Sequence, residues 1–237
     1  MSGGMGRPPR PIEDGFVYHA VTRGNNRQDV FHDDEDRLAF LHALGKTGER
    51  YPFRLYGYCL MTNHVHLLMR PEDGVPIGRV MQSLLVAHTR RYHKRRGGAG
   101  HVWQGRFKSP VIGDDEHLWT VLRYIEANPL RARIVADPAD YRWSSYQAHG
   151  LGRPDERLAD LPGWDDLGAT PALRRSRWRR KVLAAMPEDD LSAIRDSLRS
   201  GLPLAEPTWI AAHAARLGLP AERRPRGRPR KTEPTTP

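Results

Sequence analysis

The chain has 237 residues, a formal net charge of +10 at pH 7 and a single cysteine, Cys59. One cysteine excludes a disulfide framework and a Cys-based zinc finger. No apolar run of about 18 residues occurs, so no membrane-spanning helix is expected. The N-terminal residues lack the apolar segment of a signal peptide, which favours a cytoplasmic protein. Only five of the 38 basic residues are lysines. Because arginine offers phosphate a rigid fork of donors, this charge favours nucleic acid as partner, although GC-rich codon usage also enriches arginine.

Between residues 15 and 150 the hydrophobic pattern predicts one compact domain in which strands and helices alternate. Strands are expected over 16–22, 53–60, 64–69 and 107–112, and helices over 34–50, 77–96 and 114–128. The order β-α-β-β-α-β-α suits an antiparallel sheet with helices packed on it, which is the α+β class.

The remaining segments form a helical C-terminal extension and two terminal tails. In the extension, residues 151–219, helices are expected over 174–186, 188–199 and 207–217. Residues 1–14 are rich in glycine and proline and are expected to be flexible, and residues 220–237 are expected to be disordered. Within that last tail, Arg226, Arg228 and Arg230 resemble an AT-hook that enters a narrow A·T minor groove, the alternative being a generic basic tail.

The clearest chemical pattern is the pair His64 and His66 in a predicted strand. Residues i and i+2 of a strand lie on one face, so the two imidazoles lie side by side while Val65 and Leu67 face the core. Two adjacent imidazoles form half of a divalent-metal site. The alternative is two ordinary histidines on an exposed strand.

A second pattern lies on the helix that is expected to end before Pro129. Tyr124 and Asn128 are four residues apart, so they project from one helix face. A tyrosine hydroxyl can act as a nucleophile, and an asparagine oxygen can bind a metal. Alternatively, Tyr124 is a half-buried helix aromatic and Asn128 a helix cap.

Two segments are candidates for binding DNA. Residues 90–108 combine basic groups with aromatic rings for base stacking and contain no acidic residue. The candidates there are Arg90, Arg91, Lys94, Arg95, Arg96, Trp103, Arg106 and Lys108. The alternative is a solvated basic helix end with the aromatic rings in the core. The second segment follows the first predicted strand and contributes Arg23, Asn25, Asn26 and Arg27.

Four segments together resemble a known family. Residues 18–31, 58–68, 100–109 and 123–135, in this order and spacing, resemble the REP-associated tyrosine transposases, and the region 201–231 resembles the C-terminal part of many such proteins. These are single-tyrosine HUH nucleases, similar to small insertion-sequence transposases that act on single-stranded DNA. The resemblance implies a ferredoxin-like antiparallel sheet with helices packed on it.

The resemblance also implies roles for individual residues. His64 and His66 match the metal ligands, for Mg²⁺ or Mn²⁺, and Tyr124 matches the nucleophile that forms a 5′-phosphotyrosine. Asn128 lies where insertion-sequence relatives place a glutamine as third ligand. Because asparagine is one methylene shorter, ligation through a water or positioning of Tyr124 stays open. In relatives the N-terminal segment that contains Arg23 helps to read a short guide sequence beside the hairpin.

The resulting hypothesis is a metal-dependent enzyme that cleaves and rejoins single-stranded, hairpin-bearing DNA. One alternative is a non-catalytic DNA-binding protein, such as a repressor or a chromosome-structuring factor. Another is a metal phosphoesterase with water as nucleophile, in which Tyr124→Phe leaves turnover largely intact. The sequence identifies no general base for Tyr124, and it does not decide between a monomer and a homodimer.

Overall fold

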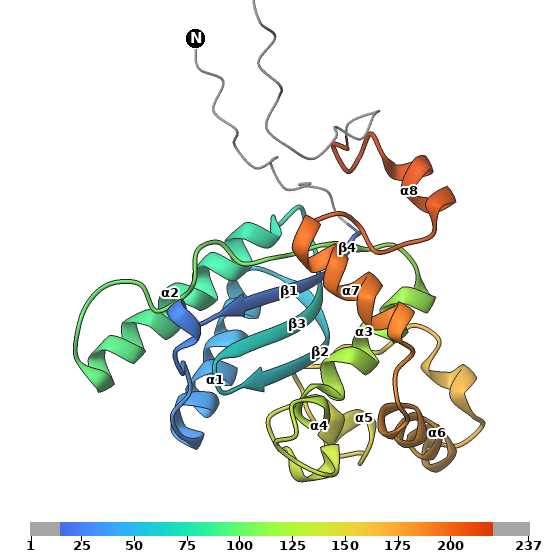
Figure 1. Cartoon of the computed structure of the whole chain (residues 1–237), viewed down its shortest axis with the longest axis horizontal. Helices are drawn as coiled ribbons and strands as arrows, with labels where there is room; N and C mark the ends of the chain where they lie inside the picture. The colour runs from blue at the N-terminus through green and yellow to red at the C-terminus, as the bar shows by residue number, and fades with distance from the viewer. Residues whose placement is uncertain (1–14, 220–237) are drawn as a thin grey trace, which may run out of the picture.

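The computed structural model describes residues 15–219, and its centre is a four-stranded antiparallel sheet. The strands lie in the order β2-β3-β1-β4. Their bounds are Val17–Arg23 for β1, Phe53–Met61 for β2, His64–Pro71 for β3 and Val111–Ile112 for β4. Helices cover both faces of this sheet (Figure 1), so the predicted α+β class is confirmed.

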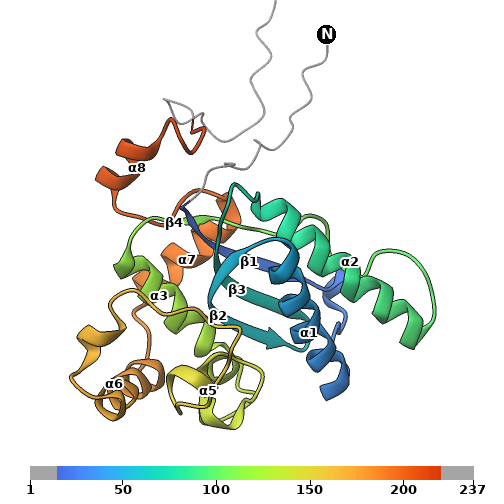
Figure 2. The same cartoon turned by 180° about the vertical axis from the view of Figure 1, so that it is seen from behind.

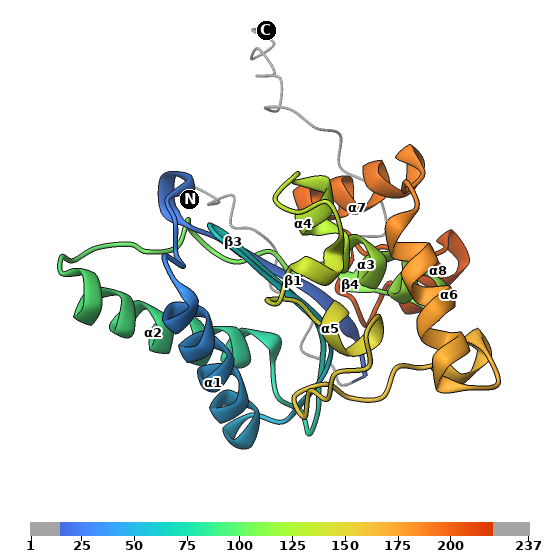
Figure 3. The ribbon, with the colours of Figure 1, turned by 90° about the horizontal axis from the view of Figure 1, so that it is seen from below.

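Helices α1 (Asp34–Arg50) and α2 (Ile77–Arg96) pack on one face of the sheet, as the view from behind shows (Figure 2). Helix α3 (Asp115–Glu126) packs on the other face against β2 and β3, and Figure 3 shows the two layers on opposite sides of the sheet. The other helical segments are η1 Asn25–Arg27, α4 Asn128–Arg131, η2 Pro138–Asp140, α5 Tyr146–His149, η3 Trp164–Leu167, α6 Pro171–Leu183, α7 Glu188–Ser200 and α8 Pro207–His213.

Strand β3 is buried on both faces because helices cover both. Alternation turns Val65, Leu67 and Met69 toward α1 and α2, and each is at most 1% exposed. His66 and Leu68 face the α3 side and are nearly as buried. The predicted division of this strand into an apolar face and a histidine face therefore holds.

Short polar side chains set where two helices begin. The Asp33 carboxylate accepts a hydrogen bond from the Asp36 amide at the start of α1, and Asp114 accepts one from the His117 amide at the start of α3. Such caps satisfy amides that lack partners within the helix. The predicted bounds of the helices at 34–50 and 77–96 agree with the structure.

Two predicted elements of the sheet domain were too long. The helix expected over 114–128 ends at Glu126, because Pro129 has no amide hydrogen to continue the hydrogen-bond ladder, and the short α4 follows. The strand expected over 107–112 keeps only Val111 and Ile112, since Pro110 interrupts it, while Lys108 forms an isolated bridge to Val21.

The C-terminal extension contacts both edge strands of the sheet. At the β2 edge, Leu158 pairs with Leu55, and at the β4 edge Leu204 pairs with Ile112. The last helix, expected over 207–217, ends at His213. Within residues 15–219, no helix is long and apolar enough to cross a membrane.

Candidate active site

The α3 side of the sheet contains a cavity of about 530 Å³ where β1, β3, α3 and α7 meet. Its walls come from segments far apart in the sequence and combine imidazole, phenol, amide and basic groups. They consist of Val21, Thr22, Arg23, His64, His66, Gln104, Arg106, Lys108, Tyr124, Asn128, Arg131 and Leu198. The cavity therefore brings together both predicted histidines, the predicted tyrosine and Asn128.

His66 is held between two side chains. Its Nε2 lies 3.0 Å from Asn128 Nδ2, and its Nδ1 lies 2.9 Å from His19 Nε2. The amide of Asn128 donates to Nε2, so the ring proton of His66 is on Nδ1 and is donated to His19. Burial, with nearby positive charge as a smaller cause, holds the pKa of His66 well below its usual value. The His66 ring is therefore neutral, with its Nε2 lone pair directed at Asn128.

His64 is fixed in a similar tautomer. Its Nδ1 donates to Asn63 Oδ1 at 2.7 Å, which leaves the Nε2 lone pair available. Burial, together with the charge of Arg23, lowers the pKa of His64 to about 4. The His64 and His66 rings lie edge to face, with centroids 5.1 Å apart.

Tyr124 lies on α3 with its ring against the histidines. Its centroid is 5.8 Å from that of His66 and 5.9 Å from that of His19. The guanidinium carbon of Arg131 lies 4.1 Å from the centre of the tyrosine ring, and Arg131 Nη1 donates to the Tyr124 carbonyl at 3.4 Å. This cation–π contact fixes the ring beside a permanent positive charge.

The donor set fits a divalent metal ion. Both imidazoles are neutral, and the Nε2 lone pair of His64 is available. A metal would replace the hydrogen bond that His66 Nε2 accepts from the Asn128 amide, and the oxygen of that amide is a suitable third ligand. Among the described residues, no group of three or more His, Cys, Asp or Glu side chains is placed to hold a metal. A metal bound by His64, His66 and Asn128 would therefore keep its full charge, which suits a phosphate as a further ligand.

Three of the predicted DNA-binding residues line the same cavity. Arg23, Arg106 and Lys108 are exposed side chains on its rim, and none forms an ion pair with another described residue. Their positive charges are free to attract a phosphate backbone.

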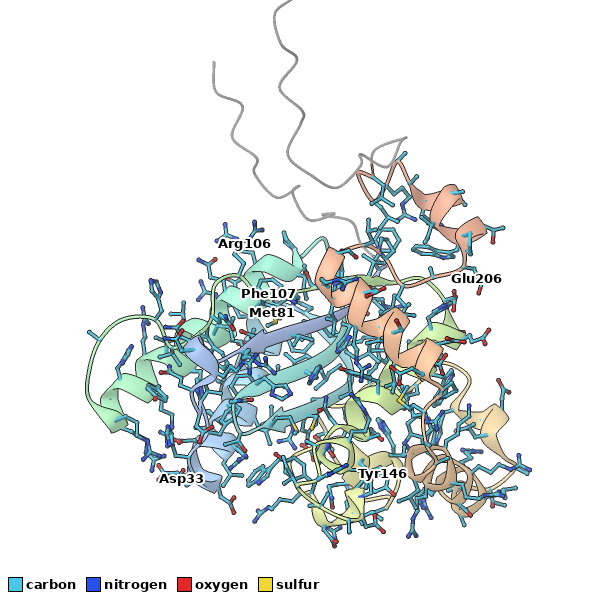
Figure 4. The ribbon with its side chains drawn as sticks, viewed as in Figure 1. Asp33, Met81, Arg106, Phe107, Tyr146 and Glu206 are labelled. Carbon is cyan, nitrogen blue, oxygen red and sulfur yellow. The ribbon has the colours of Figure 1, made fainter. Side chains whose placement is uncertain are left out.

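Other predicted DNA-binding arginines are engaged within the protein. Arg91 pairs with Glu35, and Arg95 and Arg96 both pair with Asp33, which is labelled in Figure 4, and with Asp36. These ion pairs join α1 to the C-terminal end of α2 and neutralise much of the charge that the sequence shows there. Lys94 on α2 is exposed.

For Trp103 the structure agrees with the alternative that the aromatic rings of this segment lie in the core. The Trp103 side chain is only 8% exposed, because the loop after α2 folds back over that helix. The Trp103 ring packs against the His88 ring, with centroids 5.2 Å apart. It is therefore a core residue and not an open stacking surface. Together with Arg90 it lines a second cavity, of about 340 Å³, beside α2.

The remaining predicted residues lie away from the cavity. Asn25, Asn26 and Arg27 form η1 directly after β1, and the Asn26 and Arg27 side chains are exposed. Arg226, Arg228 and Arg230 lie outside the described residues, as do the tails expected to be flexible or disordered.

Sequence reasoning missed His19, Gln104 and Arg131. His19 is 1% exposed, and burial lowers its pKa to about 3. Alternation along β1 places His19 on the same face as Arg23, but only the pairing of β1 with β3 brings it to His66. The local sequence carries no signal for that pairing.

Comparisons with known proteins agree with this geometry. The family model described as "Transposase IS200 like" matches residues 14–128. A REP-associated tyrosine transposase of Haemophilus influenzae is 32% identical over 145 residues, which cover 57% of this chain and 78% of that protein. A solved structure of a REP-associated tyrosine transposase bound to a REP hairpin has the same fold, with a TM-score of 0.54 at 18% identity. That match covers 67% of this chain and 94% of the other.

Proposed function

The chain belongs to the REP-associated tyrosine transposases, and on that premise we propose that it cleaves and rejoins single-stranded, hairpin-bearing DNA through a covalent bond to Tyr124. One observation carries the proposal. Tyr124, His66 and Asn128 converge in one cavity, with the Tyr124 ring 5.8 Å from His66 and Asn128 hydrogen-bonded to the same imidazole.

The proposed reaction is a transesterification. The Tyr124 oxygen attacks the scissile phosphorus, and the bond from phosphorus to the 3′ oxygen of the preceding nucleotide breaks. The tyrosine proton passes to solvent during the attack, and the departing oxygen takes up a proton from solvent to become a 3′-hydroxyl. The other fragment stays joined to Tyr124 through its 5′-phosphate. One phosphate ester replaces another, so a second 3′-hydroxyl can reverse the step on a new strand without ATP.

The proposed metal site consists of His64 and His66, with Asn128 as the third side chain. Mg²⁺ or Mn²⁺ bound there would polarise the scissile phosphate and neutralise charge that develops during the attack. The protein keeps both imidazoles neutral by burial, and neutral imidazole is the form that binds a metal. Asn63 and His19 hold the two rings from behind.

The basic rim supports a DNA substrate. Arg23, Arg106 and Lys108 place positive charge around the opening of the cavity that contains Tyr124. A scissile phosphate that reaches Tyr124 passes these side chains, and their charges stabilise the strand on either side of it. The structural neighbour bound to a REP hairpin supports a REP-like hairpin as the element recognised next to the cleavage site.

Strand joining without ATP tests the reaction. A hairpin-bearing single strand is incubated with the protein, Mn²⁺ and a labelled strand that ends in a 3′-hydroxyl. Joined product is expected with the wild-type chain and not with Tyr124→Phe. Cleavage that persists in Tyr124→Phe, with no joining in either protein, would show that water is the nucleophile and would refute the proposal.

A further inference from the structure

Helix α3 has a second face with conspicuous polar and aromatic side chains, and this face points away from the cavity. Trp119, Arg123 and Glu126 follow one another at spacings of four and three residues, so they lie on one side of the helix. Tyr124 projects into the cavity from another side. All three residues of the outer face contact the C-terminal extension, whereas the proposed reaction uses none of them.

Glu126 is the centre of these contacts. Its side chain is fully buried, and its two oxygens accept three hydrogen bonds: Oε1 from Ser145 Oγ at 2.5 Å and from His149 Nδ1 at 2.6 Å, and Oε2 from Trp178 Nε1 at 2.7 Å. A buried carboxylate is costly unless its oxygens are satisfied in this way. The three donors come from the loop before α5, from α5 and from α6.

The Ser145 hydroxyl extends this network to the sheet. Ser145 Oγ also accepts a hydrogen bond from the Tyr58 amide of β2 at 3.1 Å. Glu126 is therefore tied to the sheet through Ser145 and to α6 through Trp178. A side chain held from two directions leaves the end of α3 little freedom to shift.

Two further contacts attach the same helix face to the extension. Arg123 Nη2 donates to the carbonyls of Ala184 and Ala185, at 3.0 and 2.9 Å, where α6 ends. The Trp119 ring packs edge to face on Trp178, with centroids 5.3 Å apart. Helix ends fray when nothing holds them, and here the last turn of α3 is held on its outer side.

We infer that Glu126, held by Ser145, His149 and Trp178, is a positioning residue that fixes the end of α3 and thereby places Tyr124 and Asn128 for the reaction. Glu126 lies two residues after Tyr124 and two before Asn128. A displacement of this turn moves both side chains relative to His66, and an error of about 1 Å in a reacting group can cost about a hundredfold in rate. The C-terminal extension is thus part of the catalytic apparatus. This inference rests on the proposed function for its catalytic consequence.

The test compares two substitutions that loosen Glu126 or Arg123 with one that does not. Trp178→Phe removes the N–H that reaches Glu126 and also shortens a buried ring that packs on Trp119. Arg123→Gln removes the guanidinium from the end of α6. Val182→Ala is the matched control, because Val182 is fully buried on the same helix but forms no hydrogen bond to α3. Each full-length protein is measured by amide hydrogen exchange over residues 122–128, by hairpin binding, and by the rate of covalent product formation at saturating DNA with Mn²⁺.

We expect Trp178→Phe to raise amide exchange in residues 122–128 by about tenfold and to slow covalent product formation about tenfold, with DNA affinity changed less than about twofold. Arg123→Gln should also raise amide exchange and slow covalent product formation. Val182→Ala should leave the exchange and the rate of product formation near wild type, although it lowers thermal stability by a similar amount. Unchanged exchange in Trp178→Phe, or an equal rise in Val182→Ala, would overturn the inference. Absence of covalent product with the wild-type chain would refute the proposed function instead, and the exchange data would still decide whether Glu126 fixes the helix end.

Discussion

At the residue scale, the position of His66 depends on a partner from another strand. His66 donates its Nδ1 proton to His19 of β1, and this leaves its Nε2 lone pair on the cavity side. A hydrogen bond behind a metal-binding imidazole sets both its tautomer and its orientation. His19 is buried and neutral, which makes it suited to accept this proton and unsuited to bind the metal itself.

Removal of His19 should therefore weaken metal binding. His19→Ala is expected to lower the affinity for Mn²⁺ by about ten- to a hundredfold, because the His66 ring loses the acceptor that orients it. His19→Gln, whose amide oxygen can accept the same proton, should recover part of the loss. Titration calorimetry with Mn²⁺ measures both variants, with His42→Ala as control for an exposed histidine. An unchanged affinity in His19→Ala would show that His66 does not need this partner.

The site could be predicted from the sequence in part. His64, His66 and Tyr124 were identified because their spacing gives them a shared face or because the resemblance assigns them roles. His19 and Arg131 could not be found in this way, since each reaches the site through tertiary packing. For Trp103 the sequence left both a stacking surface and a core position open, because an aromatic residue in a basic loop shows the same local pattern in either place.

A buried histidine outside the site should make stability depend on pH. Burial lowers the pKa of His88 to about 4, below its ordinary value of 6.5, and its Nε2–H donates to the Val30 carbonyl. The unfolded chain thus takes up the proton first as the pH falls. The His88 contribution to the free energy of unfolding is present above about pH 6.5 and is lost as the pH falls toward 4, by roughly 2–3 kcal/mol.

His88→Gln tests this pH dependence. Glutamine keeps a donor for the Val30 carbonyl but cannot titrate, so the free energy of unfolding should fall less steeply between pH 6.5 and 4 than in the wild-type chain. Urea unfolding at several pH values measures the two slopes, and the difference between them isolates His88 from the other buried histidines. Equal slopes would contradict a neutral His88 in the folded state.

At the element scale, α3 approaches the sheet closely at Gly57 of β2. A Cβ at this position would lie 2.3 Å from Leu122 Cδ1 of α3, in a strand where the pairing register shifts between Leu55 and Gly57. Glycine is therefore needed here for close packing of the helix that carries Tyr124.

Gly57→Ala should push α3 away from the sheet. We expect a loss of about 1–3 kcal/mol in the free energy of unfolding from overpacking, together with slower DNA cleavage because Tyr124 moves with its helix. Gly45→Ala is the control: it lies in α1 with nothing near its Cβ position and should stabilise the protein by about 0.5–1 kcal/mol. Wild-type stability and activity in Gly57→Ala would show that α3 can shift to accommodate the methyl group without loss of stability or cleavage.

Local signals predicted most elements but not how they pack. Helices α1 and α2 follow clear apolar spacing and end at recognisable caps or glycine, so their bounds were correct. The strand expected over 107–112 was too long, because Pro110 interrupts it and only Val111 and Ile112 remain in β4. The attachment of α6 to α3 depends on hydrogen bonds between residues about 50 positions apart, such as Glu126 and Trp178, and no local pattern reports such pairs.

At the scale of the whole molecule, the net charge of +10 is distributed unevenly. The arginines at the end of α2 are paired with acidic residues of α1, whereas Arg23, Arg106 and Lys108 surround the cavity without described ion-pair partners. The number of counterions released on binding depends on how many basic side chains contact phosphates. The side chains on the cavity rim should therefore account for most of the salt dependence of DNA binding.

Arg106→Ala and Lys108→Ala should each weaken binding of single-stranded DNA and lower the slope of log affinity against log salt by about 0.7. Arg91→Ala, which removes an arginine already paired with Glu35, should change this slope much less. Fluorescence anisotropy at several salt concentrations measures all three variants. A loss of slope in Arg91→Ala as large as in Arg106→Ala would place the DNA along α2 instead of at the cavity.

The central claim is that Tyr124 becomes covalently joined to DNA. The most direct measurement incubates the full-length protein with a hairpin-bearing single strand labelled at its 3′ end, in Mn²⁺ or Mg²⁺, and separates the products on a denaturing protein gel. A labelled protein band is expected with the wild-type chain and none with Tyr124→Phe or His64→Ala. A band of equal intensity in Tyr124→Phe, or cleaved DNA with no labelled protein, would contradict it.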